Sequence, residues 1–232
     1  MLLSSSLLSI IMMGQSSPGQ IARAEEQQRL VKCVADIQEN PEEAYDRALA
    51  WLSEGRRPLA QQCRALALVG LGQEAKGAYL LEELANAAKG GSIKQRIGYL
   101  TQAGNAWLLA GKPDAALLTL ENALRLKPND PLLHADRAAA YMALENWTRA
   151  ELDLDRALQS LPSNKDILKM RAETRLQLGD ITGAKKDIFD AMDIDITDLE
   201  TLRLRGEIIN AETTREVETR ERNTSPVIIG NE

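Results

Sequence analysis

Residues 97–130 read IGYLTQAGNAWLLAGKPDAALLTLENALRLKPND, residues 131–164 read PLLHADRAAAYMALENWTRAELDLDRALQSLPSN, and residues 165–198 read KDILKMRAETRLQLGDITGAKKDIFDAMDIDITD. Written beneath one another, the three segments place residues of the same kind in the same columns at a step of 34 residues. The clearest columns hold Gly104, Ala138 and Ala172; Ala116, Ala150 and Ala184; Leu120, Leu154 and Ile188; and Ala123, Ala157 and Ala191. A sustained period of this length indicates one supersecondary unit copied head to tail.

These columns fit two antiparallel helices joined by a short turn. Ala150, Leu154 and Ala157 are four and three residues apart, so they share one face of a second helix. A small residue in each helix, such as Ala138 and Ala150, allows the two helices to approach closely. The turn between the two helices holds Gly111, Asn146 or Gly179, where chain reversal needs a permissive backbone. Pro128 and Pro162 end the second helix of their units. The pattern therefore predicts an all-α chain of stacked helix pairs.

This arrangement resembles the tetratricopeptide repeat (TPR). The columns stand in the family's order and spacing: a small residue, the aromatic Trp107 or Tyr141, the turn, and then Ala, Leu, Ala and Pro. The third segment departs from the pattern, with Arg175 at the aromatic position and Ile196 at the proline position. The resemblance implies a right-handed superhelical solenoid of helix-turn-helix repeats, and it leaves the partner unidentified because one fold hosts many functions.

The rest of the chain divides around the three clear repeats. Residues 25–57 are interpreted as a degenerate TPR-like repeat and residues 58–91 as a further TPR-like repeat. An insertion before residue 97 is expected to lengthen the next first helix by about one turn. Residues 199–222 predict a C-terminal capping helix with its extension, because an open solenoid end needs a cover. Residues 223–232 are expected to form a disordered tail.

The N-terminal 24 residues differ from the repeats. They form an apolar stretch broken by serines and end in Ala22-Arg23-Ala24, with small residues where a signal peptidase cleaves. Residues 1–24 are therefore interpreted as a candidate signal peptide, removed after Ala24, that exports the chain to a periplasm, an organelle lumen or the cell exterior. No Lys or Arg precedes the apolar stretch, so a disordered apolar tail on a cytoplasmic protein stays open as the alternative.

Cys33 and Cys63 are the two cysteines of the chain and lie 30 residues apart, close to one repeat. This spacing places them on the first helices of neighbouring repeats. In an exported chain they can form a disulfide, whereas in a reducing compartment they would be two inert thiols.

Composition and motifs favour binding over catalysis. His134 is the single histidine and is interpreted as a surface residue, and Asp153 with Arg137 as a surface ion pair. The acidic residues from Asp193 onward fail the spacing of a calcium loop, so no metal and no cofactor is expected. The net charge is −6 without a basic stripe, which disfavours nucleic acid. No apolar run reaches the roughly 18 residues that a membrane span needs.

The resemblance to TPR proteins implies that ligands bind in a concave groove lined by the first helices. The family's contact positions correspond here to Thr101, Asn105, Leu108, Leu109, Ala135, Ala139, Met142, Lys169, Glu173 and Leu176. This groove is apolar in its middle and charged toward its C-terminal end, which favours an apolar peptide or an amphipathic helix. One TPR subclass grips the C-terminal carboxylate of chaperones. Asn105 matches that clamp, but Asp136 and Asp166 stand at other clamp positions and disfavour it.

The sequence therefore predicts a non-catalytic protein–protein interaction scaffold or assembly factor. Two alternatives stay open: an accessory subunit or cryptic enzyme, and a self-associating structural protein. In the second alternative Leu108, Leu109 and Met142 would be covered by the N-terminal segment or by another copy of the chain. Groove binding is preferred because exposed apolar patches usually mark contacts with partners.

Overall fold

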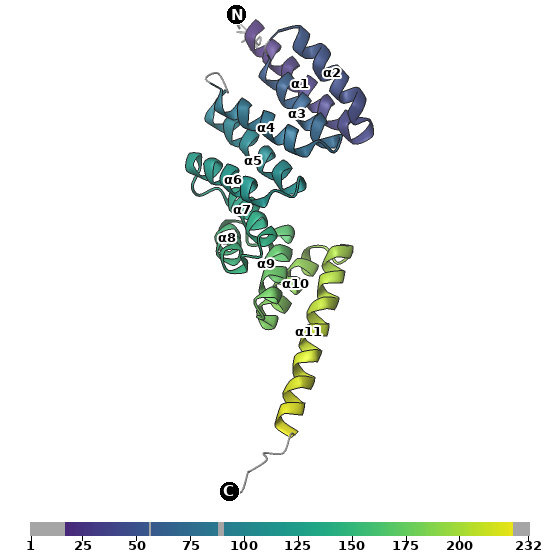
Figure 1. The fold of residues 1–232 in the computed structure, drawn as a ribbon, viewed down its shortest axis with the longest axis vertical. Helices are drawn as coiled ribbons and strands as arrows, with labels where there is room; N and C mark the ends of the chain where they lie inside the picture. The colour runs from purple at the N-terminus through teal and green to yellow at the C-terminus, as the bar shows by residue number, and fades with distance from the viewer. Residues whose placement is uncertain (1–16, 56, 88–90, 225–232) are drawn as a thin grey trace, which may run out of the picture.

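The computed structural model describes residues 17–55, 57–87 and 91–224, and its regular secondary structure in these ranges is entirely helical. The helices follow one another along an elongated array, with α11 at the far end from α1 (Figure 1). Their bounds are α1 Pro18–Glu39, α2 Pro41–Ser53, α3 Pro58–Gly70, α4 Glu74–Asn86, α5 Ile93–Leu109, α6 Pro113–Leu126, α7 Pro131–Ala143, α8 Trp147–Ser160, α9 Lys165–Gln177, α10 Ile181–Ile194 and α11 Leu199–Thr224. The predicted all-α array is confirmed.

Consecutive helices pack as pairs, and the first helices of neighbouring pairs also touch. α5 packs on α6, α7 on α8 and α9 on α10, while α5 also contacts α7 and α7 contacts α9. The first helices therefore form one continuous side of the array, and this side carries the predicted groove residues.

Local sequence determines where the helices begin. Asp130 caps α7, because its carboxylate accepts hydrogen bonds from the backbone N–H groups of Leu132 and Leu133 at 3.0 and 3.3 Å. Ser92 and Gln95 form a capping box at the start of α5. α5 therefore begins earlier than its counterpart and has 17 residues, against 13 in α7. Proline occupies the first helical position, where its missing N–H costs nothing, in α1, α2, α3, α6 and α7.

The turns inside the helix pairs require a left-handed backbone. Gly111 and Gly179 have φ angles of 66° and 78°, which glycine adopts without steric cost. In the pair between them the same conformation is taken by Glu145, with φ 55°. Asn146, which the sequence placed in this turn, instead caps α8 and accepts a hydrogen bond from the backbone N–H of Arg149. The step of 34 residues from Gly111 leads to Glu145, so the left-handed position keeps the repeat period.

The small-residue columns form the contact between paired helices. Ala138 and Ala150 are fully buried and belong to one cluster with Leu154 and Ala157. At Gly104 an added Cβ would lie 2.7 Å from a side-chain carbon of Leu120, so the column needs its smallest residue there. The close approach that the columns predicted is therefore present, and a larger side chain would force the helices apart.

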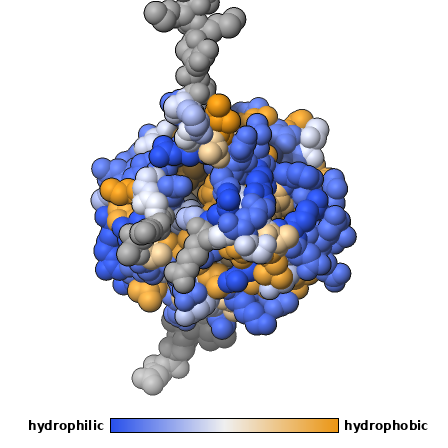
Figure 2. Space-filling model, turned by 90° about the horizontal axis from the view of Figure 1, so that it is seen from above, coloured by the Kyte–Doolittle hydropathy of each residue, from blue (hydrophilic) through white to orange (hydrophobic). Residues whose placement is uncertain are grey.

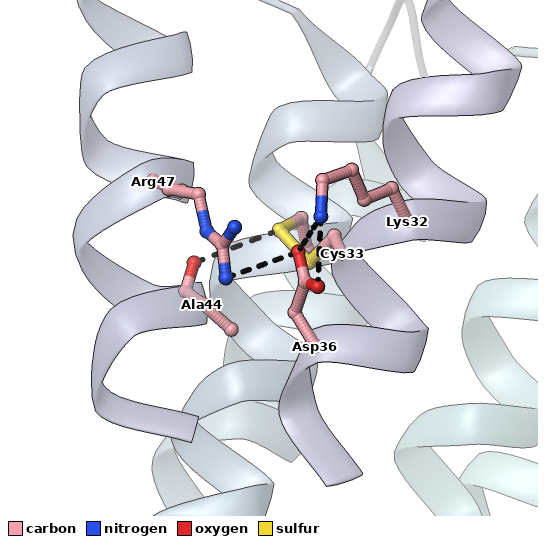
Figure 3. Close-up of a disulfide and its surroundings, with 6 residues drawn as sticks. Lys32, Cys33, Asp36, Ala44 and Arg47 are labelled. Carbon is pink, nitrogen blue, oxygen red and sulfur yellow. Dashed lines mark hydrogen bonds and ion pairs between the residues drawn. A yellow bond between two sulfur atoms is a disulfide. The ribbon is translucent and has the colours of Figure 1, made fainter. Parts of the chain in front are cut away.

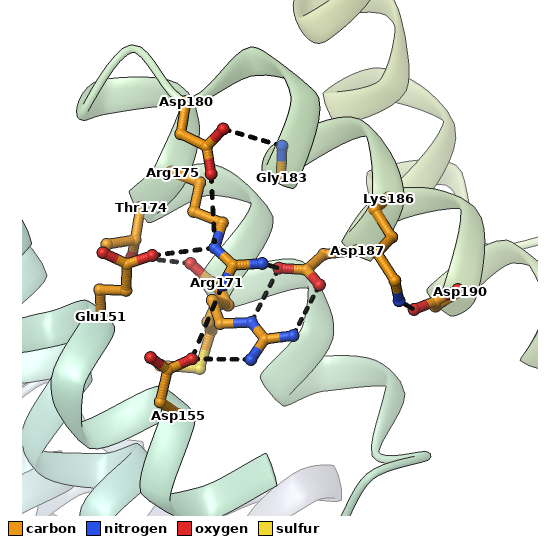
Figure 4. Close-up of polar contacts among 11 residues, drawn as sticks. Glu151, Asp155, Arg171, Thr174, Arg175, Asp180, Gly183, Lys186, Asp187 and Asp190 are labelled. Atoms are coloured by element: carbon orange, nitrogen blue, oxygen red, sulfur yellow. Dashed lines mark hydrogen bonds and ion pairs between the residues drawn. The ribbon is translucent and has the colours of Figure 1, made fainter.

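Buried ion pairs also join the helices of the last two pairs, and here the expectation of a surface ion pair was wrong. Asp153 is 1% exposed and accepts hydrogen bonds from Arg137 at 2.7 and 2.8 Å. One period later, fully buried Asp187 accepts from Arg171 at 2.7 and 2.8 Å (Figure 4). The guanidinium fork matches both carboxylate oxygens, which allows the charge to be buried.

His134 belongs to the same buried cluster rather than to the surface, where the sequence analysis had placed it. Its Nδ1 lies 3.0 Å from a carboxylate oxygen of Asp153, and its Nε2 lies 2.9 Å from the carbonyl oxygen of Pro128. The ring thus connects the turn before α7 to α8. Asp153 on α8 is thus a buried partner of His134, and the sequence offered no reason to expect an acid beside this histidine.

A disulfide joins the first two helix pairs. Cys33 on α1 and Cys63 on α3 are bonded, with their Cα atoms 6.0 Å apart (Figure 3). Beside the disulfide, Asp36 lies between Lys32 and Arg47 at 3.0 and 3.1 Å. The cysteine spacing had placed both residues on neighbouring first helices, and the structure brings them together there.

The beginning of helix α11 is buried against the last pair, and further along the helix Glu212 still pairs with Lys185 of α10 at 2.7 Å. Thr201, Leu204 and Ile208 are buried, and the two apolar ones pack in a cluster with Ile188 of α10. Beyond them the helix is mostly exposed and projects away from the array (Figure 1). Among the helices that the structure describes, none combines the length and the hydrophobicity needed to cross a membrane.

Candidate functional site

The ten predicted groove residues lie on three first helices that pack side by side. Four of them are on α5, three on α7 and three on α9, and α7 contacts both other helices. In order along the chain they are Thr101, Asn105, Leu108 and Leu109; Ala135, Ala139 and Met142; and Lys169, Glu173 and Leu176. The fold thus brings together, on one side of the array, residues up to 75 positions apart in the sequence.

Within this set, side-chain exposure differs strongly. Leu109 is 69% exposed and Asn105 is also exposed, whereas Ala135 is buried and the others are half-buried. Leu132, on the first turn of α7, is 56% exposed as well. Seen from above, the molecule shows hydrophobic patches set among hydrophilic residues (Figure 2). Asn105 and Leu109 are therefore the most exposed of the predicted groove residues, and Leu132 adds an exposed leucine on the neighbouring helix.

Leu108 and Met142, two of the predicted groove residues, pack against the core. Leu108 packs against the buried cluster of Ala116, Leu120 and Ala140, and Met142 packs against the cluster around Ala138. Sequence analysis treated the two side chains as free for a partner. A charge at either position would also weaken the helix packing, so these residues cannot by themselves separate binding from folding.

Polar side chains cross from helix to helix along the same face. The Nε2 group of Gln62 on α3 donates to the Oε1 atom of Gln102 on α5 at 2.8 Å. On α7, burial raises the pKa of the Asp136 carboxyl to about 6, and the negative charge of Asp130 adds to this rise. A hydrogen bond from Asn105 lowers the same pKa and offsets part of the rise. Asp136 therefore changes its charge near neutral pH beside an exposed groove residue.

At the C-terminal end of the groove the lysines are paired with acids. Lys169 lies 3.1 Å from Asp166 and 2.9 Å from Asp198, and Lys165 lies 2.9 Å from Asp195 and 3.0 Å from Asp198. Hydrogen bonds from the two lysines hold the pKa of Asp198 well below its usual range, against partial desolvation. Because Asp166, Asp195 and Asp198 outnumber the two lysines and Glu173 adds a further carboxyl group, this end of the predicted groove is acidic overall.

The single histidine of the chain is held inside the fold. Both ring nitrogens of His134 face hydrogen-bond acceptors inside the fold, so the histidine is not presented to a substrate. Among the described residues no group of three or more His, Cys, Asp or Glu side chains is placed to hold a metal ion. The arrangement is suited to recognition by shape, apolar contact and charge.

Sequence similarity to known proteins covers only part of the chain, whereas similarity to solved structures covers more of it. No family model matches the chain. RNA polymerase II-associated protein 3 of Xenopus tropicalis is 27% identical over 97 residues, which are 42% of this chain and 15% of that protein. The rat protein of the same name is 26% identical over 122 residues, 53% of this chain and 18% of that protein. The chain thus matches less than a fifth of the length of these curated relatives.

Solved structures of TPR proteins align with the helix array. The first TPR domain of the human RPAP3 protein matches with a TM-score of 0.50 and 26% identity, covering 52% of this chain and 94% of that domain. A thermophilic TPR protein of Thermus thermophilus matches with a TM-score of 0.59 and 24% identity, covering 81% of this chain and 99% of that one. The chain is a tetratricopeptide repeat solenoid, as its 34-residue columns predicted.

Proposed function

We propose that the chain is a non-catalytic scaffold that binds a peptide or an amphipathic helix of a partner protein along α5, α7 and α9. The observation that carries this proposal is the exposure of Leu109, 69%, on a first helix whose neighbours continue the same side of the array. An exposed leucine beside half-buried Leu108 and Met142 provides apolar surface that a partner can cover.

The charges along the groove narrow the proposed ligand. The α7 part of the surface has the apolar side chains Ala135, Ala139 and Met142 with the single carboxyl of Asp136 beside them. The α9 end is acidic overall because its carboxyl groups outnumber the two paired lysines. A ligand that complements this surface has an apolar face in the middle and basic residues at one end. An amphipathic helix with Lys or Arg beyond its apolar stripe has both features.

Two other functions make different predictions. A self-associating protein would cover the same leucine with a second copy, so its sedimentation would depend on its concentration and Leu109→Glu would make it monomeric. If the chain is an accessory subunit or a cryptic enzyme, catalytic turnover should still be measurable with the purified protein. The buried position of His134 favours the scaffold over the enzyme.

Export is a separate proposal, and it is supported by the disulfide and by the packing of α1. Disulfides persist mainly in oxidising compartments. Residues 1–16 of the candidate signal peptide lie outside the described residues, and Ala22–Ala24 lie in the exposed beginning of α1. Glu26 is the first residue of α1 that bonds beyond its own helix, accepting from Trp51 of α2 and from Arg57, which precedes α3. Cleavage after Ala24 would leave these contacts intact, and N-terminal sequencing of the native protein tests it.

The binding proposal is tested with two matched leucines. Leu109→Glu on α5 and Leu118→Glu on α6 each add one charge at a leucine that is 69% or 60% exposed. Both variants should keep the wild-type unfolding midpoint. Capture of cross-linked partners from native extract should fall strongly for Leu109→Glu alone, since a charge at an interface must be desolvated. Equal capture by the two variants would refute the groove as the binding surface.

A further inference from the structure

A second concavity lies away from the predicted groove residues. It encloses about 570 Å³ between α2, α3, α4 and the end of α5. Its lining includes three aromatic and three basic side chains: Tyr45, Tyr79, Trp107, Arg64, Lys76 and Lys112. A volume of this size suits a small ligand or a few residues of a peptide.

Arg64 occupies a repeat position that elsewhere binds a buried acid. Arg137 and Arg171 each pair with an aspartate 16 residues further along the chain, on the second helix of the same repeat. Sixteen residues after Arg64 the chain has Leu80. Arg64 therefore keeps the arginine of the pair but lacks its aspartate.

No partner replaces the missing acid within the part of the chain that the structure describes. Arg64 makes no hydrogen bond or ion pair there, and its Nε atom is buried without a hydrogen-bond acceptor. A buried donor without an acceptor is costly, and most such groups in native proteins are satisfied. A ligand that supplies the acceptor would remove this cost.

The lining of this cavity favours an anion at Arg64, and the exposed Glu83 beside Arg64 lines a neighbouring hollow instead. Lys76 and Lys112 add two positive charges, and no acidic side chain is among the described residues that line the cavity, although the whole chain carries a net charge of −6. The ring of Trp107 is held by a hydrogen bond from its Nε1 group to Glu82 at 3.1 Å, and the Lys112 ammonium lies 5.3 Å from the ring centroid. Tyr79 at the rim is 56% exposed.

We propose that this cavity binds an acidic peptide segment, with a carboxylate on Arg64 and an apolar or aromatic side chain against Tyr45, Tyr79 and Trp107. A guanidinium binds a carboxylate through two parallel hydrogen bonds, which is the geometry that the second-helix aspartates supply to Arg137 and Arg171. Aromatic rings provide rigid contact area for the neighbouring side chain. This site is separate from the groove of the proposed function, so either one can fail without the other.

The binding test uses three defined probes. They are the acetylated and amidated tripeptide Glu-Phe-Glu, its Gln-Phe-Gln counterpart and inorganic phosphate. The readout is the indole N–H signal of Trp107 in NMR titrations of the full chain, identified by its loss in Trp107→Phe. We expect the acidic tripeptide to shift this signal and the neutral one to bind at least about tenfold more weakly, the difference that a charge-assisted bidentate pair can supply. Equal affinity of the two peptides, or displacement of the acidic peptide by an equal concentration of phosphate, would overturn the proposal.

A variant of Arg64 separates binding from structure. Arg64→Leu should weaken binding of the acidic tripeptide at least about tenfold, whereas Lys94→Gln, which removes an exposed positive charge outside the cavity lining, should change it less than about twofold. Arg64→Leu should leave the melting temperature unchanged or raise it, because it removes an unsatisfied buried donor. A fall in melting temperature as large as that of Arg137→Leu would show that Arg64 is structural and would overturn the proposal.

Discussion

Replacing Asp136 with asparagine should change how the stability of the protein depends on pH. Burial raises the pKa of this carboxyl from 3.8 to about 6, so the folded protein favours the protonated form more than the unfolded chain does. Asparagine keeps the shape and a hydrogen-bonding group beside Asn105 but cannot ionise. The substitution therefore removes one titration and little else.

The sign and size of the effect follow from proton linkage. Between about pH 4 and pH 6 the folded state binds more protons than the unfolded state, so the free energy of unfolding falls as the pH rises. A shift of one pKa unit corresponds to about 1.4 kcal/mol, so the rise to about 6 corresponds to roughly 3 kcal/mol. The contribution is fully present below about pH 4 and is lost above about pH 6.

Urea denaturation of the wild type and Asp136→Asn at half-unit steps from about pH 4 to about pH 8 measures this effect. The difference in unfolding free energy between the two proteins should change by about 3 kcal/mol in favour of the variant as the pH rises from about 4 to about 7. Other carboxyl groups titrate equally in both proteins and cancel in the difference. Parallel curves for the two proteins would show that Asp136 is solvated and would refute this reasoning.

Three further predictions concern packing and can be measured by the same denaturation assay. Asp187→Ala should cost about 3–5 kcal/mol because it removes the fully buried carboxylate that Arg171 and Arg175 share, and only their partly exposed partners Asp155 and Glu151 remain. Asp190→Ala removes an exposed pair and should cost less than about 1 kcal/mol. Ala150→Asp should cost about 3 kcal/mol or more at a fully buried site, against less than about 0.5 kcal/mol for the exposed Thr148→Asp; equal effects would show a wrong helix register. Reducing the disulfide, which closes a separation of 30 residues, should cost about 3–4 kcal/mol; no change would show that the thiols are unbonded.

The helix array could be predicted because the information that determines it is local and periodic. Ala138 and Ala150 are buried against each other because small residues at that spacing let two helices meet, and the 34-residue step repeats this contact. Turn and cap positions follow from glycine, proline and Asp130 at the ends of the apolar pattern. These features depend on neighbours within one repeat.

The polar interior could not be predicted from residue type, since charged side chains are usually exposed. Asp153 was placed on the surface for that reason, although it is 1% exposed. The signal that would have identified it is again the period: Arg137 and Arg171, like Asp153 and Asp187, are 34 residues apart. When an arginine on the first helix and an aspartate on the second helix both recur at the same 34-residue step, they indicate an ion pair inside the repeat.

The helices that carry the predicted groove residues could be predicted, but the burial of each side chain could not. The resemblance placed Asn105 and Met142 on neighbouring first helices, where the structure has them. The half-burial of Met142 and the raised pKa of Asp136 depend on how tightly α5, α7 and the second helices pack, which no local pattern states. Arg64 differs again, because its signal is the absence of the aspartate that pairs with Arg137 and Arg171 in the later repeats, where Leu80 stands instead.

Site-specific photo-crosslinking in the native host tests the central claim most directly. A photoreactive amino acid is placed at Asn105, exposed on α5, or at Leu152, which is 52% exposed on α8. If the first helices form the binding surface, the α5 position should label a discrete partner protein and the α8 position should not. Labelling of the same partner from α8, with none from α5, would contradict the account.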